Sequence, residues 1–253
     1  MLNSEYLEAH KPENQLEQYF LQNKGRLIHK WIHYFPIYER HFKQFRNKEI
    51  NVLEIGVYQG GSLQMWKSYF GEKAKIYGVD INPACKSLEE ENIKIYIGSQ
   101  EDREFLRFLK KEIPLLHILI DDGGHTMRQQ ICTFEELYDH VVEDGVYLCE
   151  DTHTSYWKSH GGVFRKKGTF IEYMKNQIDF LHAWHSEDKK RFNVNAFTRS
   201  TYGIHFYDSI VVIEKRPIQE PYHMMTGKAV LPPYKPKNQK RKKGFLSRLK
   251  KTL

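Results

Sequence analysis

The stretch His117-Ile118-Leu119-Ile120-Asp121-Asp122-Gly123-Gly124-His125 decides the fold. Its apolar half has the composition of a strand that is buried on both faces, as in the middle of a parallel sheet. Two carboxylates, two glycines and an imidazole follow at once, and the glycines let the backbone turn tightly. Because ligands of open α/β sheets bind beyond the carboxyl ends of the strands, we expect a ligand at residues 121–125.

A second copy of this pattern follows at Gly145-Val146-Tyr147-Leu148-Cys149, which runs into Glu150-Asp151-Thr152-His153. Asp122 and the pair Glu150-Asp151 should therefore lie at the ends of consecutive strands. Hard oxygen donors in this arrangement suit Mg²⁺ or a similar divalent cation, and the lack of an accompanying Cys/His cluster disfavours zinc. The sequence thus predicts a metal site made of Asp122, Glu150 and Asp151, although such acids could instead cap the helices that follow.

The chain has a formal net charge of +7, but its basic residues are unevenly distributed. Residues 221–253 hold ten of the 39 Lys and Arg residues and none of the 32 Asp and Glu residues, which leaves the rest slightly acidic. The body of the protein is therefore not a general binder of polyanions. With 253 residues, of which 40% are hydrophobic, the chain can bury one sizeable core, so we expect one domain with appendages.

The three cysteines, Cys85, Cys132 and Cys149, are scattered, which argues against a disulfide framework and fits a reducing compartment. The first residues, Met1-Leu2-Asn3-Ser4-Glu5, do not begin a basic segment followed by an apolar one, as a signal peptide does. No apolar run reaches the length of a membrane-spanning helix. We therefore expect a soluble, cytoplasmic protein.

Short β-rich runs alternate with helical ones on both sides of the opening stretch. We expect strands at 50–56, 75–80, 93–98, 117–120 and 145–149, and helices at 63–70, 103–111, 127–142 and 169–180. This alternation predicts an α/β fold with a parallel sheet that is wound on both faces. Residues 202–214 break the alternation and are typical of two strands joined by a tight turn near Tyr207-Asp208, so one strand at the end of the sheet should be antiparallel.

Residues 1–49 precede the first clear strand and have apolar and aromatic residues at helical spacing, at Leu16, Tyr19 and Phe20 and again from Trp31 to Tyr38. We expect helices that either pack against the main domain or cover its ligand-binding mouth. The predicted organisation is a helical N-terminal extension over 1–49, a main domain over 50–216 and a basic, flexible tail over 217–253.

The segment Glu54-Ile55-Gly56-Val57-Tyr58-Gln59-Gly60-Gly61-Ser62 combines the end of a strand, a glycine-rich turn and the start of a helix. Such a turn lets a ligand approach the backbone, and the free N–H groups of a helix N-terminus attract an anionic group. Asp80 ends the next strand, where a carboxylate can bind the ribose that NAD and S-adenosylmethionine both carry. The Lys-Ser/Thr of a phosphate-binding loop is missing, which disfavours ATP or GTP hydrolysis.

Taken in order, these segments resemble the S-adenosylmethionine-binding loops of class I methyltransferases, whose Rossmann-like, mostly parallel sheet ends in an antiparallel hairpin. The resemblance implies that Gly56, Gly60 and Ser62 line the methionine end of the cofactor. It also implies that Asp80 binds the ribose and that Gln100 and Asp102 meet the adenine. The expected cofactor-binding set also includes Glu54, Tyr58 and Asp121.

The order Asp122-Gly123-Gly124-His125 and then Glu150-Asp151 resembles the metal-dependent sugar O-methyltransferases of macrolide pathways, of the mycinamicin and macrocin type. The cephalosporin hydroxylase-like proteins are a neighbouring family, and the resemblance covers residues 50–215. It implies that Asp122, Glu150 and Asp151 bind the metal and that His125 is the general base, with His153 as the reserve candidate.

The implied activity is Mg²⁺-dependent transfer of a methyl group from S-adenosylmethionine to a sugar hydroxyl of a glycan, a glycoside or a nucleotide sugar. Such a hydroxyl is a weak acid, so a metal that stabilises the developing alkoxide and a base that removes the proton both help.

Two other classes of function stay open at this point. An NAD-dependent oxidoreductase could use the same glycine turn, but it would not explain the acids at two later strand ends. A binding module could act through the basic tail, and residues 235–253 are a candidate for peripheral contact with an anionic membrane. We expect no nucleic-acid partner, because a base-stacking platform is missing.

Overall fold

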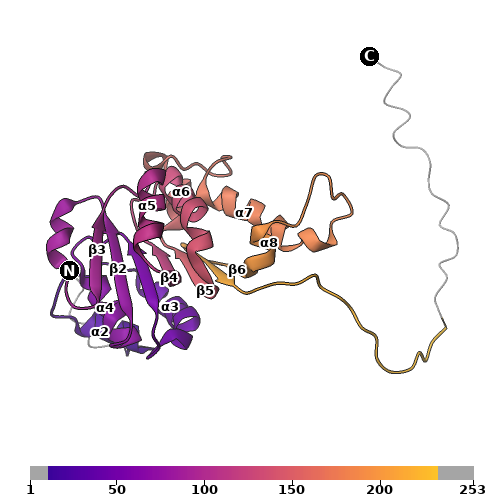
Figure 1. The fold of residues 1–253 in the computed structure, drawn as a ribbon, viewed down its shortest axis with the longest axis horizontal. Coiled ribbons are helices and arrows are strands. Elements are labelled where there is room, and N and C mark those ends of the chain that lie inside the picture. The colour runs from indigo at the N-terminus through magenta and orange to yellow at the C-terminus, as the bar shows by residue number, and fades with distance from the viewer. Residues whose placement is uncertain (1–10, 233–253) are drawn as a thin grey trace, which may run out of the picture. The chain divides into compact units, whose positions relative to one another are not determined.

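The computed structural model describes residues 11–232, and within that range seven strands form one sheet in the order β3-β2-β1-β4-β5-β7-β6 (Figure 1). The strands are β1 (Asn51–Ile55), β2 (Lys75–Asp80), β3 (Ile93–Ile97), β4 (Leu116–Asp121), β5 (Val141–Cys149), β6 (Thr201–Tyr207) and β7 (Ile210–Lys215). The first five are parallel to one another, and β7 is antiparallel to both β5 and β6. The predicted mostly parallel sheet with a closing hairpin is confirmed.

The strand order reverses between β1 and β4, because the chain builds outward from β1 to β3 and then returns to β1's other edge. In the register of the sheet, Ile55 lies beside Asp121, and Asp121 lies beside Cys149. The loops after β1, β4 and β5 therefore leave the sheet next to one another. This reversal point is where open α/β sheets bind their ligands.

The helices connect these strands and precede them. The α-helices are α2 (Gln15–Gln22), α3 (Phe35–Phe42), α4 (Gly61–Phe70), α5 (Arg103–Glu112), α6 (Met127–Leu137), α7 (Phe170–Leu181) and α8 (Ala196–Ser200). Shorter 3₁₀ helices occur at Ile32–Tyr34, Lys43–Phe45, Pro83–Leu88, Tyr138–His140, Thr152–Tyr156, Lys158–His160 and Ala183–His185.

Both faces of the sheet are buried, as the apolar strands predicted. Ile118 and Val146 point to one face, which α2, α3 and α4 cover, whereas Leu119 and Tyr147 point to the other, which α5, α6 and α7 cover (Figure 1). Side chains alternate between the two faces because successive Cβ atoms of a strand point in opposite directions. The N-terminal helices α2 and α3 thus belong to the same core as the sheet.

The structure corrects one predicted helix. The pattern over 127–142 suggested a helix throughout, but α6 ends at Leu137, and β5 begins at Val141, well before the expected start at Gly145. The β-branched pair Val141-Val142 favours a strand, and a register shift between β4 and β5 at Leu116 and Ile118 accommodates the extra residues.

Of the described residues, 11–220 belong to one compact unit and 221–232 belong to a second. The predicted role of residues 235–253 in membrane contact falls outside the part of the chain that the structure describes. Between residues 11 and 232, no helix combines the length and the apolar character that crossing a bilayer requires.

Candidate active site at the carboxyl ends of the strands

A cavity of about 550 Å³ opens at the carboxyl ends of the central strands. Its walls come from the loops after β1, β2, β3, β4 and β5, and from the segment that precedes the 3₁₀ helix at Ile32. Its volume is in the usual range for sites that bind small molecules and cofactors. The cavity is lined by residues 27–31, Tyr34, 55–59, Ser62, 79–82, Cys85, 98–100, 122–125, Gln129, Glu150 and Asp151.

The glycine turn after β1 is held against two neighbouring loops. Gly56 has a φ of 99°, and a Cβ there would collide with the backbone carbonyl oxygen of Asp122, so only glycine fits. Asp80 fastens the turn from the other side, because its Oδ2 accepts hydrogen bonds of 2.9 Å from the backbone N–H groups of Val57 and Tyr58. The turn is therefore preorganised before any ligand binds.

Asp121 and Gln100 form a buried support beneath the loop after β4. Asp121 is fully buried, and its Oδ1 accepts a hydrogen bond from the side-chain amide of Gln100. The amide oxygen of Gln100 in turn accepts the backbone N–H of Gly124 at 3.0 Å. Burial raises the pKa of Asp121 to about 7, opposed by the hydrogen bond from Gln100. Asp121 points away from the cavity, whereas its neighbour Asp122 lines it.

The ammonium of Lys30 lies within a cluster of three carboxylates. Lys30 Nζ donates to Asp122 Oδ2 at 2.6 Å, to Glu150 Oε1 and Oε2 at 2.9 and 3.0 Å, and to Glu54 Oε1 at 3.2 Å. Glu54 Oε2 accepts a further hydrogen bond from Ser62 Oγ at 2.6 Å. The side chains of Lys30, Glu54 and Glu150 are almost completely inaccessible to solvent, which makes these charge-assisted contacts mutually dependent.

The pKa shifts within this cluster reflect an excess of negative charge. Burial by itself lowers the pKa of Lys30, but Asp122, Glu150 and Glu54 together raise it well above its usual range. Burial and the neighbouring carboxylate of Asp122 raise the pKa of Glu150 well above its usual range. Burial also raises the pKa of Asp122 and of Glu54, even though Lys30 opposes both shifts. One ammonium therefore does not fully compensate the carboxylates around it.

His125 and Asp151 form the outer part of the site together with Asp122. His125 Nε2 lies 3.8 Å from Asp122 Oδ1 and 3.6 Å from Asp151 Oδ2. The hydroxyl of Tyr34 donates to Asp151 Oδ1 at 2.6 Å and holds that carboxylate in place. Burial lowers the pKa of His125 to about 4, so its imidazole is neutral at pH 7.

The reserve candidate His153 lies outside the cavity. Its Nδ1 contacts the hydroxyl of Ser209, and its ring packs against Trp157 with the ring centres 4.5 Å apart. His153 Nδ1 is also 3.9 Å from Asp151 Oδ1, so it can influence that carboxylate without facing a ligand.

The cavity gathers most of the residues that the sequence singled out. Gly56, Tyr58, Ser62, Asp80, Gln100, Asp122, His125, Glu150 and Asp151 line it, whereas Glu54, Gly60, Asp102 and Asp121 do not. Asp102 instead caps helix α5 by accepting the backbone N–H of Glu104 at 2.9 Å.

The acids proposed for the metal do not cap helices. Thr126 caps α6, and the side chain of Asp151 makes no capping hydrogen bond to the helix that follows it.

Six lining residues, 27–31 and Tyr34, come from the N-terminal segment, and none of them was predicted as a site residue. Lys30, Trp31 and Tyr34 reach the cavity from a stretch whose sequence pattern predicted only a lid or a packing element. Their spacing suggested helical packing, and no local motif marks Lys30 as the partner of carboxylates 92 and 120 positions away.

No family model matches the chain, but comparison with known proteins finds similar O-methyltransferases. Demethylmacrocin O-methyltransferase from Streptomyces fradiae is 36% identical over 217 residues, which are 81% of this chain and 53% of that protein. Mycinamicin VI 2''-O-methyltransferase from Micromonospora griseorubida is 34% identical over 196 residues, which are 73% of this chain and 49% of that protein.

A solved structure of the MycE methyltransferase from the mycinamycin biosynthetic pathway, in complex with Mg and SAH, matches with a TM-score of 0.71 and 32% identity. The match covers 83% of this chain and 56% of that one, and the chain spans about half the length of its relatives. In sequence and in structure, the chain is therefore a homologue of the macrolide and sugar O-methyltransferases, and it has the Rossmann-like fold of class I methyltransferases.

Proposed function

We propose that this chain is an S-adenosylmethionine-dependent and divalent-metal-dependent O-methyltransferase that acts on a sugar hydroxyl. The observation that carries the proposal is one cavity in which the glycine turn and Asp80 meet Asp122, His125 and Asp151. A cofactor bound at the glycine turn and Asp80 would lie beside an acceptor bound at Asp122, His125 and Asp151, as methyl transfer requires.

The cofactor half of the cavity suits S-adenosylmethionine. Asp80 Oδ2 accepts two backbone N–H groups and Oδ1 accepts that of Asn82, and a carboxylate oxygen with a second lone pair can also accept a ribose hydroxyl. Gly56 and Ser62 line the same cavity beside the N-terminus of α4, where a helix favours the negative charge of a carboxylate. The homologous MycE structure contains SAH, which supports the same class of cofactor here.

The donor set of the other half fits Mg²⁺ or a similar cation. Asp122, Glu150 and Asp151 line this half of the cavity, and oxygen is the donor that Mg²⁺ prefers. Lys30 contributes a single ammonium to Asp122, Glu150 and the buried Glu54. Donor atoms of Asp122, His125 and Asp151 lie within 4.8 Å of one another. Lys30 already binds both oxygens of Glu150, so we expect Asp122 and Asp151 to dominate the metal affinity.

His125 is the proposed general base. Its imidazole is neutral at pH 7, and Nε2 faces the space between Asp122 and Asp151, so it can accept the proton of a hydroxyl bound there. A bound divalent cation would supply positive charge that favours the alkoxide form of that hydroxyl. Tyr34 keeps Asp151 oriented, and the glycine turn keeps the cofactor wall rigid, so both partners of the transfer are positioned by this chain.

The acceptor would enter past two aromatic rings. Trp31 and Tyr58 line the cavity yet remain 54% and 61% exposed, so their rings offer amphipathic surfaces at its mouth. We infer that the acceptor is a sugar of a glycan, a glycoside or a nucleotide sugar.

The deciding experiment measures methyl transfer and cofactor binding in parallel. The purified chain is titrated with S-adenosylmethionine, SAH and NAD by calorimetry, and is then assayed for methylation of glycosides with Mg²⁺ and with EDTA. We expect binding of the two sulfur compounds, no binding of NAD and metal-dependent methyl transfer. Binding of NAD alone would instead support an oxidoreductase and reject the proposal.

A further inference from the structure

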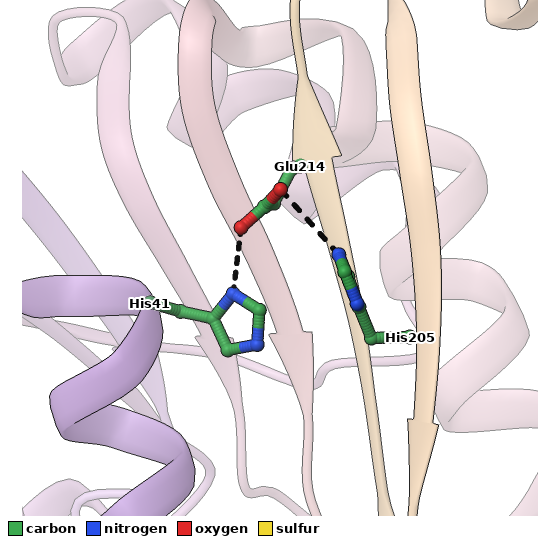
Figure 2. A group of neighbouring side chains, drawn as sticks. All are labelled: His41, His205 and Glu214. Carbon is green, nitrogen blue, oxygen red and sulfur yellow. Dashed lines mark hydrogen bonds and ion pairs between the residues drawn. The ribbon is translucent and has the colours of Figure 1, made fainter.

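Two histidines and a glutamate that do not line the cavity meet between helix α3 and the closing hairpin, and they come from three elements (Figure 2). His41 lies in the last turn of α3, His205 on β6 and Glu214 on β7. Figure 2 shows both imidazole rings directed at the same carboxylate, one from each side. We propose that these residues form a binding site for a first-row transition metal ion, with Zn²⁺ as the reference occupant.

The spacing of the donor atoms supports this assignment. His41 Nδ1 lies 2.8 Å from Glu214 Oε1, and His205 Nε2 lies 3.4 Å from Glu214 Oε2. Tetrahedral Zn²⁺ with bonds of about 2.0–2.1 Å needs neighbouring donor atoms roughly 3.3 Å apart. The donor atoms of all three residues lie within 4.8 Å of one another, so small side-chain movements complete the arrangement. Two imidazoles and a carboxylate form a zinc-type donor set that leaves a fourth position for water.

The ring of His41 is already held in the orientation that a metal ligand needs. Its second nitrogen, Nε2, lies 2.9 Å from the hydroxyl of Tyr207. When Nε2 carries the proton and donates it to Tyr207, Nδ1 presents its lone pair to the metal.

A hydrogen-bonded cluster without an ion explains these contacts less well. It accounts for the pairing of His41 with Glu214, but His205 Nε2 is buried and, although it lies 3.4 Å from Glu214 Oε2, makes no well-aligned hydrogen bond within the described residues. A buried nitrogen without a well-aligned partner is costly, and a bound cation between this ring and the carboxylate would remove that cost. The side chains of His205 and Glu214 are 31% and 30% exposed, so an ion can reach the site from solvent.

An ion at this site would join the N-terminal segment to the closing hairpin. Helix α3 starts directly after Tyr34, the residue that holds Asp151, and His41 lies near the end of the same helix. Zinc would therefore tie α3 to β6 and β7 and would stabilise the folded chain. This inference does not depend on the proposed methyl transfer.

The test uses the full chain, stripped with EDTA, dialysed and saturated with Mg²⁺ so that sites made only of oxygen donors are occupied. Zn²⁺ is titrated by calorimetry, and Co²⁺ is added separately to record the absorption of a tetrahedral site. The parent should bind one more equivalent of Zn²⁺ than His205→Gln. Tyr207→Phe should bind that equivalent roughly 10–100-fold more weakly, because it loses the partner of His41 Nε2.

His185→Gln alters an exposed histidine and should match the parent. Equal zinc binding by the parent and His205→Gln would overturn the proposal. It would also be overturned if the additional equivalent of Zn²⁺ were lost in His125→Gln but kept in His205→Gln. If His205→Gln shows no cooperative melting, Tyr207→Phe decides: unchanged zinc affinity in that variant also overturns the proposal.

Discussion

Replacing Lys30 with methionine tests whether one buried ammonium holds the carboxylates of the cavity together. Methionine keeps most of the length and volume of the side chain but removes its charge and its three donors. Lys30 contacts Asp122, Glu150 and Glu54 at 2.6–3.2 Å, and its side chain is only 2% exposed. The variant therefore removes the ammonium that all three closely spaced carboxylates contact.

The expected loss is large. Removing one partner of a buried ion pair typically destabilises a protein by about 3–5 kcal/mol, because the remaining charge stays buried and unpaired. In a domain of 150–250 residues, each kcal/mol shifts the melting temperature by roughly 2–4 °C. Lys30→Met should thus melt about 6–20 °C below the parent when EDTA is present.

Adding Mg²⁺ should reduce this difference, because a divalent cation that binds the folded carboxylates compensates part of the lost charge. Thermal melting followed by circular dichroism, with EDTA and then with excess Mg²⁺, measures both effects.

The matched control is Lys175→Met, which breaks the ion pair between Lys175 and Glu172 on the surface of α7. The side chain of Lys175 is 49% exposed, and such surface pairs contribute little to stability. The reasoning is refuted if Lys30→Met, in EDTA, melts as close to the parent as this control does.

Four further predictions address the base, the cofactor, pH and the tail. His125→Ala should lower turnover by roughly two to four orders of magnitude, because general-base catalysis is lost. Its affinity for S-adenosylmethionine should stay nearly unchanged, because Asp80 remains. Steady-state kinetics and calorimetry measure the two effects, and near-parental turnover would exclude His125 as the general base. Asp80→Ala should weaken S-adenosylmethionine binding, because the ribose partner and the support of the glycine turn both disappear, and calorimetry that shows unchanged affinity would reject this role. Burial lowers the pKa of His140, so the imidazole binds a proton more readily in the unfolded chain, and stability falls as pH drops below about 6.5. Between pH 7.5 and 5.5, the melting temperature of His140→Gln should therefore fall by less than that of the parent. Equal decreases in the two proteins would contradict this prediction. Truncation after Glu220 removes ten positive charges. It should leave turnover on a soluble acceptor intact and weaken the salt-sensitive binding to anionic vesicles. Lost turnover with unchanged vesicle binding would instead assign the tail to the acceptor site.

The sequence by itself determined the architecture and most of the cavity. Apolar runs that end in Asp80, Asp121-Asp122 and Glu150-Asp151 predicted buried parallel strands with polar groups at their carboxyl ends. The parallel arrangement brings these ends to one edge of the sheet, so side chains far apart in the chain could be expected to meet. These features are local, because strand composition and turn residues act over a few neighbouring positions.

Only the tertiary structure decided which of these carboxylates face the cavity. Asp121 and Asp122 are adjacent, yet one is buried against Gln100 and the other contacts Lys30, because successive side chains at a strand end point in opposite directions. Lys30 and Tyr34 reach the site only because α2 and α3 pack on the sheet and bring the preceding loop over its edge. Local pattern does not encode such a contact between distant residues, since packing of the whole core determines where that loop lies.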